Sequence, residues 1–386
     1  MVLVGFPLLA LSYTQSPALV AGVAVAATAP WLLVALPAGA LADRVNRRRL
    51  LVGIEAARFT ILGVFAALLL AGRSNLGVLY AAVFCLNAMS AAFDVTSSAA
   101  LPSVVVPRLL VKANSNLVSA QVAAQEIVGQ SIGGLAFAAA ASIPFVADAA
   151  TFAASAALVN RAVPDNEPDT SHSSFFEDLK DGLRWFKRLP LLRVLTGLIG
   201  SFAFCQSLVV GVVALYAIRD LHMTRSGFGI LLGASGIGIS ITAAGANQIH
   251  ARLGTGWSII TAGIAAASAY AILALTHSPF TAGGALALES AGVVVGNISS
   301  RALRQSIVPQ ELQGRIGSAF TMAVRSAVPL GGLAGGLLAQ TIGIRHTFLL
   351  AGFLQVAILA LTAPRLLNAL RRQSPAAQIP GQVLAA

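Results

Sequence analysis

Long apolar runs separated by short polar breaks fill almost the whole chain. A helix needs about 20 apolar residues to cross a bilayer, and most of the runs reach that length. The runs are rich in Ala, Gly and Leu and lack the period-2 alternation of membrane β-strands, so they predict packed helices. We expect twelve spans, near residues 1–14, 18–41, 50–71, 76–100, 116–140, 143–162, 192–217, 227–249, 256–276, 280–302, 316–341 and 346–368.

The first run, 1–14, is too short to cross a bilayer unaided. No basic segment precedes it, so it lacks the form of a signal peptide. Two explanations stay open: the chain starts upstream of Met1, or a short first helix is tolerated.

Composition agrees with a membrane protein. The chain is 57% hydrophobic and 10% charged, with a mean hydropathy of +0.82, whereas soluble domains are about 25% charged. Cys85 and Cys205 both fall inside predicted spans, where a thiol behaves as a small apolar residue. We therefore expect an all-α integral membrane protein with no disulfide, metal or other cofactor.

Basic residues lie mostly on one side of the predicted topology. If the first break faces outward, the outside loops hold only Arg73, Arg219, Arg225 and Arg345, while Arg58 and Arg325 lie within spans. The remaining 19 of the 25 face inside: Arg44, Arg47, Arg48, Arg49, Arg108, Lys112, Arg161, Lys180, Arg184, Lys187, Arg188, Arg193, Arg252, Arg301, Arg304, Arg315, Arg365, Arg371 and Arg372. This asymmetry predicts both termini in the cytoplasm of a bacterial-type inner membrane. The net charge of +11 then reflects topology and contact with anionic lipid, and it does not indicate nucleic-acid binding.

One long polar segment divides the chain into two halves of six spans. We expect an N-terminal bundle over 1–162, a cytoplasmic linker over 163–191, a C-terminal bundle over 192–370 and a cytoplasmic tail over 371–386. Within the linker, Ser174 and Glu177 have the form of a capping box at the start of an amphipathic helix on the membrane surface. The halves also repeat, because Ser131–Ala136 aligns with Pro329–Ala334.

A charged loop, Pro37–Arg49, joins the second and third spans. It resembles the loop signature of major facilitator superfamily transporters, Gly-x-Leu-Ala-Asp-Arg-x-Gly-Arg-Arg, at Gly39, Leu41, Asp43, Arg44, Arg47 and Arg48. Asn46 stands where the signature has its second Gly. Because Asn tolerates a left-handed backbone, we expect the turn to be kept. The resemblance implies a twelve-helix fold of two six-helix bundles related by a pseudo-twofold repeat, and a monomer.

Further segments resemble the enterobactin-exporter and macrolide-efflux branch of that superfamily: Glu55–Arg58, Phe93-Asp94, Phe176–Leu192 and Arg301–Gly336. The resemblance implies a proton-driven antiporter that exports a drug-like or siderophore-like molecule, as in multidrug resistance. It also implies that Asp43, Arg44 and Asp94 act as a latch between the inner ends of the bundles. The exporter motif of the fifth span is only partly present, since Gln130 replaces its Pro. Glycines expected to allow close helix packing remain at Gly129, Gly133, Gly134, Gly331 and Gly332.

Ionisable side chains inside spans mark pathways or pairs. Glu55 and Arg58 are three residues apart and can neutralise each other, so we interpret them as structural. Glu126 and Arg325 occupy related positions in the two halves, either facing each other across a cavity or forming a buried structural pair. Glu289 has no basic neighbour on its own span until Arg301, and an unpaired membrane carboxyl is a candidate proton carrier.

Two more polar residues complete the candidate cavity. Asn87 is the repeat equivalent of Glu289, and Asp148 lies about two turns from the outer surface, where hydration would suffice for it. Proton-coupled export is our main hypothesis. Import of a small metabolite and a non-transporting sensor on the same fold are the alternatives, while an enzyme is least favoured because no nucleophile, His or metal cluster suits such chemistry.

Overall fold

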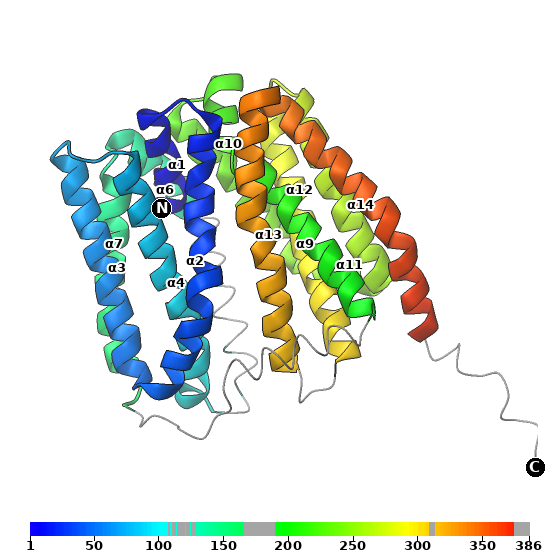
Figure 1. Ribbon diagram of the computed structural model, residues 1–386, viewed down its shortest axis with the longest axis horizontal. Coiled ribbons are helices and arrows are strands. Elements are labelled where there is room, and N and C mark those ends of the chain that lie inside the picture. The colour runs from blue at the N-terminus through cyan, green and yellow to red at the C-terminus, as the bar shows by residue number, and fades with distance from the viewer. Residues whose placement is uncertain are drawn as a thin grey trace, which may run out of the picture.

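All the secondary structure in the described part of the chain is helical, as the computed structural model in Figure 1 shows. The structure describes residues 1–106, 109, 113, 120, 124, 129–165, 190–308 and 313–373. In chain order its elements are α1 (Val2–Tyr13), α2 (Pro17–Arg44), α3 (Arg47–Leu70), α4 (Leu76–Val104), α6 (Gln130–Ala139), α7 (Ile143–Ala162), α9 (Pro190–Val210), α10 (Val213–Leu215), the π-helix η3 (Tyr216–Asp220), α11 (Arg225–Leu275), α12 (Pro279–Ile307), α13 (Gln313–Ile342) and α14 (Ile344–Gln373).

Among the described residues, ten helical segments are long and apolar enough to cross a membrane, and α1 is a shorter apolar helix of 12 residues. The predicted all-helical membrane fold is confirmed. Of the predicted fifth span, 116–140, the structure describes mainly the end, as α6. The amphipathic linker helix and the tail beyond Gln373 lie outside the described residues.

Two predicted spans share the long element α11. Gly254 interrupts it with φ 72° and ψ 166°, a backbone conformation that glycine adopts at little cost because it has no Cβ. The segments on either side, Arg225–Ala243 and Gln248–Leu275, are each long enough to span. The break predicted between residues 249 and 256 therefore falls at this kink.

The helices form two groups that lie side by side (Figure 1), α1–α4 with α6 and α7 in one and α9–α14 in the other. The groups meet mainly where α2 packs on α13 and α6 packs on α11. We call the end with the connections 14–16, 71–75, 140–142, 221–224, 276–278 and 343 the outer end, after the predicted topology, and the opposite end the inner end. The ribbons of α2 and α13 lie close at the outer end and diverge toward the inner end.

The buried apolar core also joins the groups at the outer end. One cluster contains Phe6, Phe65 and Phe145 of the first group, with ring centroids 5.0 to 5.5 Å apart, together with Tyr216 and Phe348 of the second. A second cluster, which includes Leu192, Ile259, Phe320 and Leu366, is built from the second group alone, toward the inner end. Apolar burial thus holds the two groups together at one end of the molecule.

Small residues let the backbones approach at this outer contact. A Cβ on Gly134 of α6 would lie 2.5 Å from the Cα of Gly229 on α11. A Cβ on Gly336 of α13 would lie 2.5 Å from the Cβ of Ala21 and 3.0 Å from the Cα of Ala18 on α2. Neither crossing could keep this separation with a larger residue, because side chains would overlap backbone atoms.

Two local details differ from the sequence-based expectations. Asn46 does not adopt a left-handed conformation: its φ is −59°, and its Oδ1 accepts a hydrogen bond from the Arg49 N–H at 3.1 Å, capping α3. The predicted seventh span is also not one continuous α-helix. It ends as α9 at Val210 and continues through α10 and the π-turn η3 to Asp220.

Candidate transport site

The charged loop between α2 and α3 is bonded within the first group. Arg48 Nε and Nη2 donate to Asn160 Oδ1 of α7 at 3.0 and 2.9 Å, and Asn46 donates to Asp165 just beyond α7. These bonds fasten the start of α3 to the end of α7. Asp43 and Arg44, predicted members of the latch, and Gly39 of the same signature belong to α2, but their side chains lie outside the described part of the structure.

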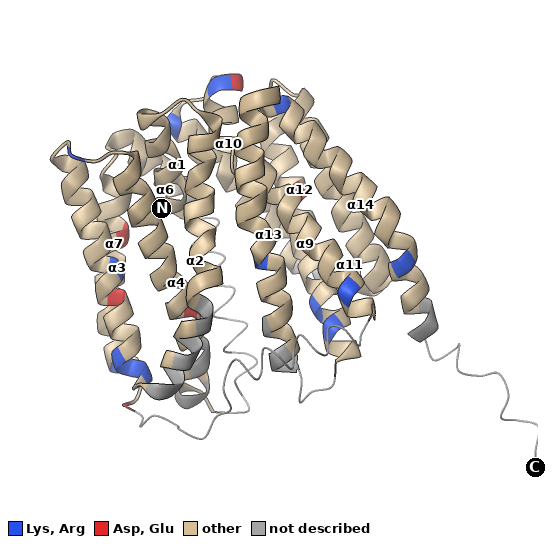
Figure 2. Ribbon diagram, in the orientation of Figure 1, with Lys and Arg blue, Asp and Glu red and all other residues tan. Residues whose placement is uncertain are grey.

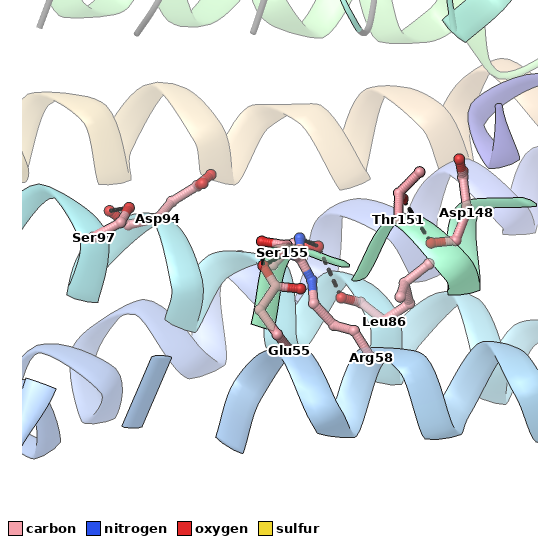
Figure 3. Close-up of polar contacts among 9 residues, drawn as sticks. Glu55, Arg58, Leu86, Asp94, Ser97, Asp148, Thr151 and Ser155 are labelled. Carbon is pink, nitrogen blue, oxygen red and sulfur yellow. Dashed lines mark hydrogen bonds and ion pairs between the residues drawn. The ribbon is translucent and has the colours of Figure 1, made fainter. Parts of the chain in front are cut away.

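Glu55 and Arg58 form the predicted ion pair, with Glu55 Oε1 3.1 Å from Arg58 Nη1 (Figure 3). The carboxyl also accepts from Ser155 Oγ of α7 at 3.1 Å, and Arg58 Nη2 donates to Ser90 Oγ of α4 at 2.6 Å. The Arg58 guanidinium lies 4.6 Å from the ring centroid of Phe152 and 5.1 Å from that of Phe93. The pair therefore ties α3, α4 and α7 together inside the first group.

Two arginines of the second group make described cation–π contacts with the first: Arg225 lies 5.7 Å from the ring centroid of Phe137, and Arg325 lies deeper in the contact between the groups. The Arg325 guanidinium lies 3.8 Å from the ring centroid of Trp31, so a cation–π contact joins α13 to α2. Its charge also interacts with that of Asp94 on α4. Four residues further on, Pro329 cannot donate a backbone hydrogen bond to the Arg325 carbonyl, which weakens α13 at this level. Arg325 thus lies at a bendable point of a helix at the contact between the groups.

Glu289 is a buried carboxyl held by neutral donors. Its side chain is 7% exposed, and Oε1 accepts from Gln206 Nε2 of α9 at 2.7 Å while Oε2 accepts from Ser290 Oγ at 3.4 Å. The hydroxyl of Tyr270 on α11 also bonds to it. Among the described residues no cation forms an ion pair with Glu289. These partners all come from the second group of helices.

The other predicted cavity residues have local partners. Asn87 Nδ2 donates to the carbonyl of Val83, one turn back on α4, at 2.8 Å. Asp148 Oδ2 accepts from the Val2 N–H at 3.0 Å and lies 3.3 Å from the Met1 amine, with the side chain 17% exposed. Glu126, the expected counterpart of Arg325, lies outside the described residues.

The predicted packing glycines lie against neighbouring backbone, apart from one. A Cβ on Gly129 would meet the Ala124 carbonyl oxygen at 2.8 Å, and one on Gly133 would meet the Met1 oxygen at the same distance. Gly331 lies against the Phe204 carbonyl oxygen of α9. At Gly332 the nearest atom would be Ser207 Oγ at 3.3 Å, a looser contact.

Sequence reasoning did not find Trp31, Gln206 or Tyr270, which complete the two polar clusters. Each is a polar or amphipathic side chain inside an apolar run, and that was the available signal. What the pattern could not supply was the rotation of each helix about its axis, which decides that Gln206 and Tyr270 turn toward Glu289 and Trp31 toward Arg325. Within the described residues no group of His, Cys, Asp and Glu could hold a metal ion.

The apolar helices define a polytopic membrane protein, and its fold is that of the major facilitator superfamily. The family of transmembrane secretion effectors matches residues 1–386, and the chain belongs to that family of major facilitator transporters. It is a transporter and not an enzyme. It is 31% identical over 195 residues to the MFS-type transporter YfiS of Bacillus subtilis (strain 168), a match that covers 47% of this chain and 44% of YfiS, less than half of either protein.

Solved transporter structures share the fold over nearly the full length. A mutant of the nucleoside transporter NupG has a TM-score of 0.72 at 12% identity, covering 95% of this chain and 94% of that one. A bacterial homologue of the human lysosomal transporter Spinster, inward-facing and occupied, has a TM-score of 0.70 at 15% identity, covering 97% and 94%. An inward-facing bacterial homologue of the iron transporter ferroportin has a TM-score of 0.64 at 19% identity, covering 95% of each chain.

Proposed function

We propose that this transporter exports a drug-like or siderophore-like small molecule by alternating access, in exchange for protons. The observation that carries the proposal is Glu289, a buried carboxyl whose partners are the neutral groups of Gln206, Tyr270 and Ser290. A carboxylate without a cation is costly in a low-dielectric interior, and protonation removes that cost. Glu289 can therefore take up and release a proton as its surroundings alternate between wet and dry.

The second supporting feature is the link between the groups at Arg325. The contact of its guanidinium with Trp31, and its interaction with Asp94, cross from α13 to α2 and α4. In the proposed cycle these interactions break when the groups rock apart at this level and form again when they return. The proposed inner gate also includes the residues of the charged loop signature, Gly39, Asp43, Arg44, Arg47 and Arg48. The proposed contributors to coupling or the substrate cavity, besides Glu289, are Arg325, Asn87, Glu126 and Asp148.

We also propose the domain division 1–162, 163–191, 192–370 and 371–386, with both termini in the cytoplasm of a bacterial-type inner membrane and a monomer as the working unit. The helix grouping supports the division, and the clustering of Arg47, Arg48 and Arg49 at one end of α3 supports placing that end of the molecule in the cytoplasm. Membrane lipid is then the surrounding partner, and protons and a small molecule are the transported species.

The test uses purified protein in proteoliposomes with an imposed proton gradient. Glu289→Gln keeps the size of the side chain and mimics the protonated carboxyl, so gradient-driven flux should fall to background while substrate binding and substrate exchange persist. Asp165→Asn is the control, because it also removes a carboxyl but at an exposed residue just beyond α7, outside the residues proposed for coupling or the cavity. That variant should keep gradient-driven flux.

The alternatives give different results in the same assay. Substrate accumulation along the proton gradient instead of against it would identify an importer. Binding without flux in the unmodified protein would identify a sensor. Gradient-driven transport by Glu289→Gln with unchanged pH dependence would remove Glu289 from the coupling mechanism.

A further inference from the structure

A pocket of about 240 Å³ lies at the inner end of the second group, between the end of α12 and the start of α13. It is lined by Arg301, Arg304, Gln305, Val308, Ile316 and Gly317. Neither Arg301 nor Arg304 forms an ion pair within the described residues. The pocket therefore combines two guanidinium groups, an amide and an apolar wall, and it is separate from the Glu289 and Arg325 clusters.

The charge around this pocket is unbalanced. From residue 190 onward the chain has twelve Arg and only three acidic residues, Asp220, Glu289 and Glu311. Asp220 ends η3 at the outer end and Glu289 is buried among neutral donors, while Glu311 lies outside the described residues. Figure 2 shows basic residues at the inner end of this group, below α9, α11 and α12. An anion there would meet little competition from described carboxylates.

The two pocket arginines are also held in an arrangement that an anion would relieve. Arg301 and Arg304 are three residues apart on α12, so their charges lie on the same face and repel each other. Arg304 cannot easily turn away, because its guanidinium is stacked 4.0 Å from the ring centroid of Phe320. Its Nε is buried and has no hydrogen-bond partner in the described part of the chain. An anion bound in the pocket would offset the repulsion between the two guanidinium charges.

We propose that this pocket binds a phosphate group, carried either by an anionic lipid headgroup or by a free phosphate compound. Planar guanidinium groups bind phosphate oxygens through paired hydrogen bonds, and two of them neutralise one phosphate. The pocket is smaller than the roughly 300 to 1,000 Å³ of drug-sized sites, which suits a headgroup or small anion better than the transported molecule. The site goes beyond the proposed export function, and it lies on α13, the helix that carries Arg325.

The test measures binding to the full-length protein in a neutral detergent. The two ligands are inorganic phosphate, compared with chloride at equal ionic strength, and short-chain phosphatidylglycerol, compared with the phosphatidylcholine of equal chain length. Native mass spectrometry counts retained lipid, and thermal unfolding reports phosphate. We expect Arg301→Gln and Arg304→Gln each to weaken binding about tenfold, the effect of losing one charged hydrogen-bond donor.

Arg365→Gln is the control, because it removes an exposed arginine of α14 at the same end without lining the pocket. It should leave binding unchanged.

Binding of phosphatidylglycerol alone assigns a lipid headgroup, and binding of inorganic phosphate assigns a free phosphate compound. Equal loss in all three variants would show a diffuse surface-charge effect and overturn the proposal, as would binding of neither ligand. Arg301 is exposed, so its variant remains informative should Arg304→Gln misfold. Proton-coupled flux, the test of the role of Glu289, is measured in a separate assay. Failure of the phosphate-site proposal therefore does not imply failure of the proposed export function, or the reverse.

Discussion

Two carboxyls, on α3 and α12, are nearly inaccessible to solvent but have different neighbours. Glu55 is 1% exposed and paired with Arg58, whereas Glu289 is 7% exposed and surrounded by neutral donors. The charge of Arg58 offsets part of the desolvation of the Glu55 carboxylate, and Glu289 has no such charged partner among the described residues. Neutral hydrogen-bond donors compensate the desolvation of the Glu289 carboxylate only in part. The same residue type therefore serves as a structural tie in one group of helices and as the proposed proton carrier in the other.

A prediction at this scale concerns the structural pair. Glu55→Gln removes the charge that neutralises Arg58, whose Nε already lacks a hydrogen-bond partner among the described residues. Breaking a buried ion pair from one side costs about 3 kcal/mol or more, so the thermal unfolding temperature in detergent and the folded yield should both fall. The double variant Glu55→Gln/Arg58→Gln should recover part of the loss, since no buried charge is left. An unfolding temperature equal to that of the unmodified protein in Glu55→Gln would show that the pair contributes little.

Which side chains contact the buried charged residues could be predicted from the sequence only in part. The pairing of Glu55 with Arg58 could be predicted because both lie on one helix, three residues apart. Gln206, a partner of Glu289, lies 83 residues away on another helix, and Trp31 lies in the other group of helices from Arg325. Their choice depends on helix rotation and depth, which hydrophobic periodicity leaves undetermined when a helix is apolar on nearly all sides.

Among the elements, the helices themselves could be predicted well, because a bilayer requires runs of a fixed minimum length with satisfied backbone groups. The kink at Gly254 coincides with a break expected from polarity. The end of α9 at Val210 falls inside the apolar run, whereas the π-turn at Tyr216–Asp220 contains residue 217, the predicted end of the seventh span. Tyr216 is held there by tertiary contacts, its hydroxyl donating to the Leu273 carbonyl at 2.7 Å and its ring packing on Phe348.

The crossing of α6 and α11 permits a test of how helix packing sets conformation. Gly134→Ala would bring a Cβ within 2.5 Å of the Gly229 backbone, so α6 and α11 must separate at the outer end. We expect the variant to fold, to become more reactive toward a thiol reagent at an outer-end cysteine, and to transport several-fold more slowly. Gly63→Ala is the control, because nothing lies within 4 Å of a Cβ at that position of α3. Identical reactivity in the two variants would mean that this contact does not hold the outer end closed.

At the scale of the whole molecule, the described contacts between the two groups concentrate at the outer end. The apolar cluster around Tyr216 and Phe348 joins them there, and the α6–α11 and α2–α13 crossings are tight there. The structure therefore represents a state closed at the outer end. Alternating access requires a second state in which this interface opens. The apolar surface that the two groups bury at the outer end is then exposed, and new contacts between the groups at the inner end must compensate for its loss.

Locking the outer interface tests both the cycle and the orientation. Ser16 Oγ lies 3.5 Å from Gln340 Oε1, joining the start of α2 to the outer part of α13. With Cys85 and Cys205 replaced by Ala, a Ser16→Cys/Gln340→Cys pair should react with a short, membrane-impermeant bifunctional thiol reagent added outside intact cells. Cross-linking should stop transport, because the outer end can no longer open.

Tyr13→Cys/Ser74→Cys provides the matched control, since its two side chains are bonded to each other at the same end but within one group. That pair should cross-link without loss of transport. Full transport in the cross-linked Ser16/Gln340 pair would contradict rocking at this interface, and reaction only after permeabilisation of the cells would reverse the proposed orientation.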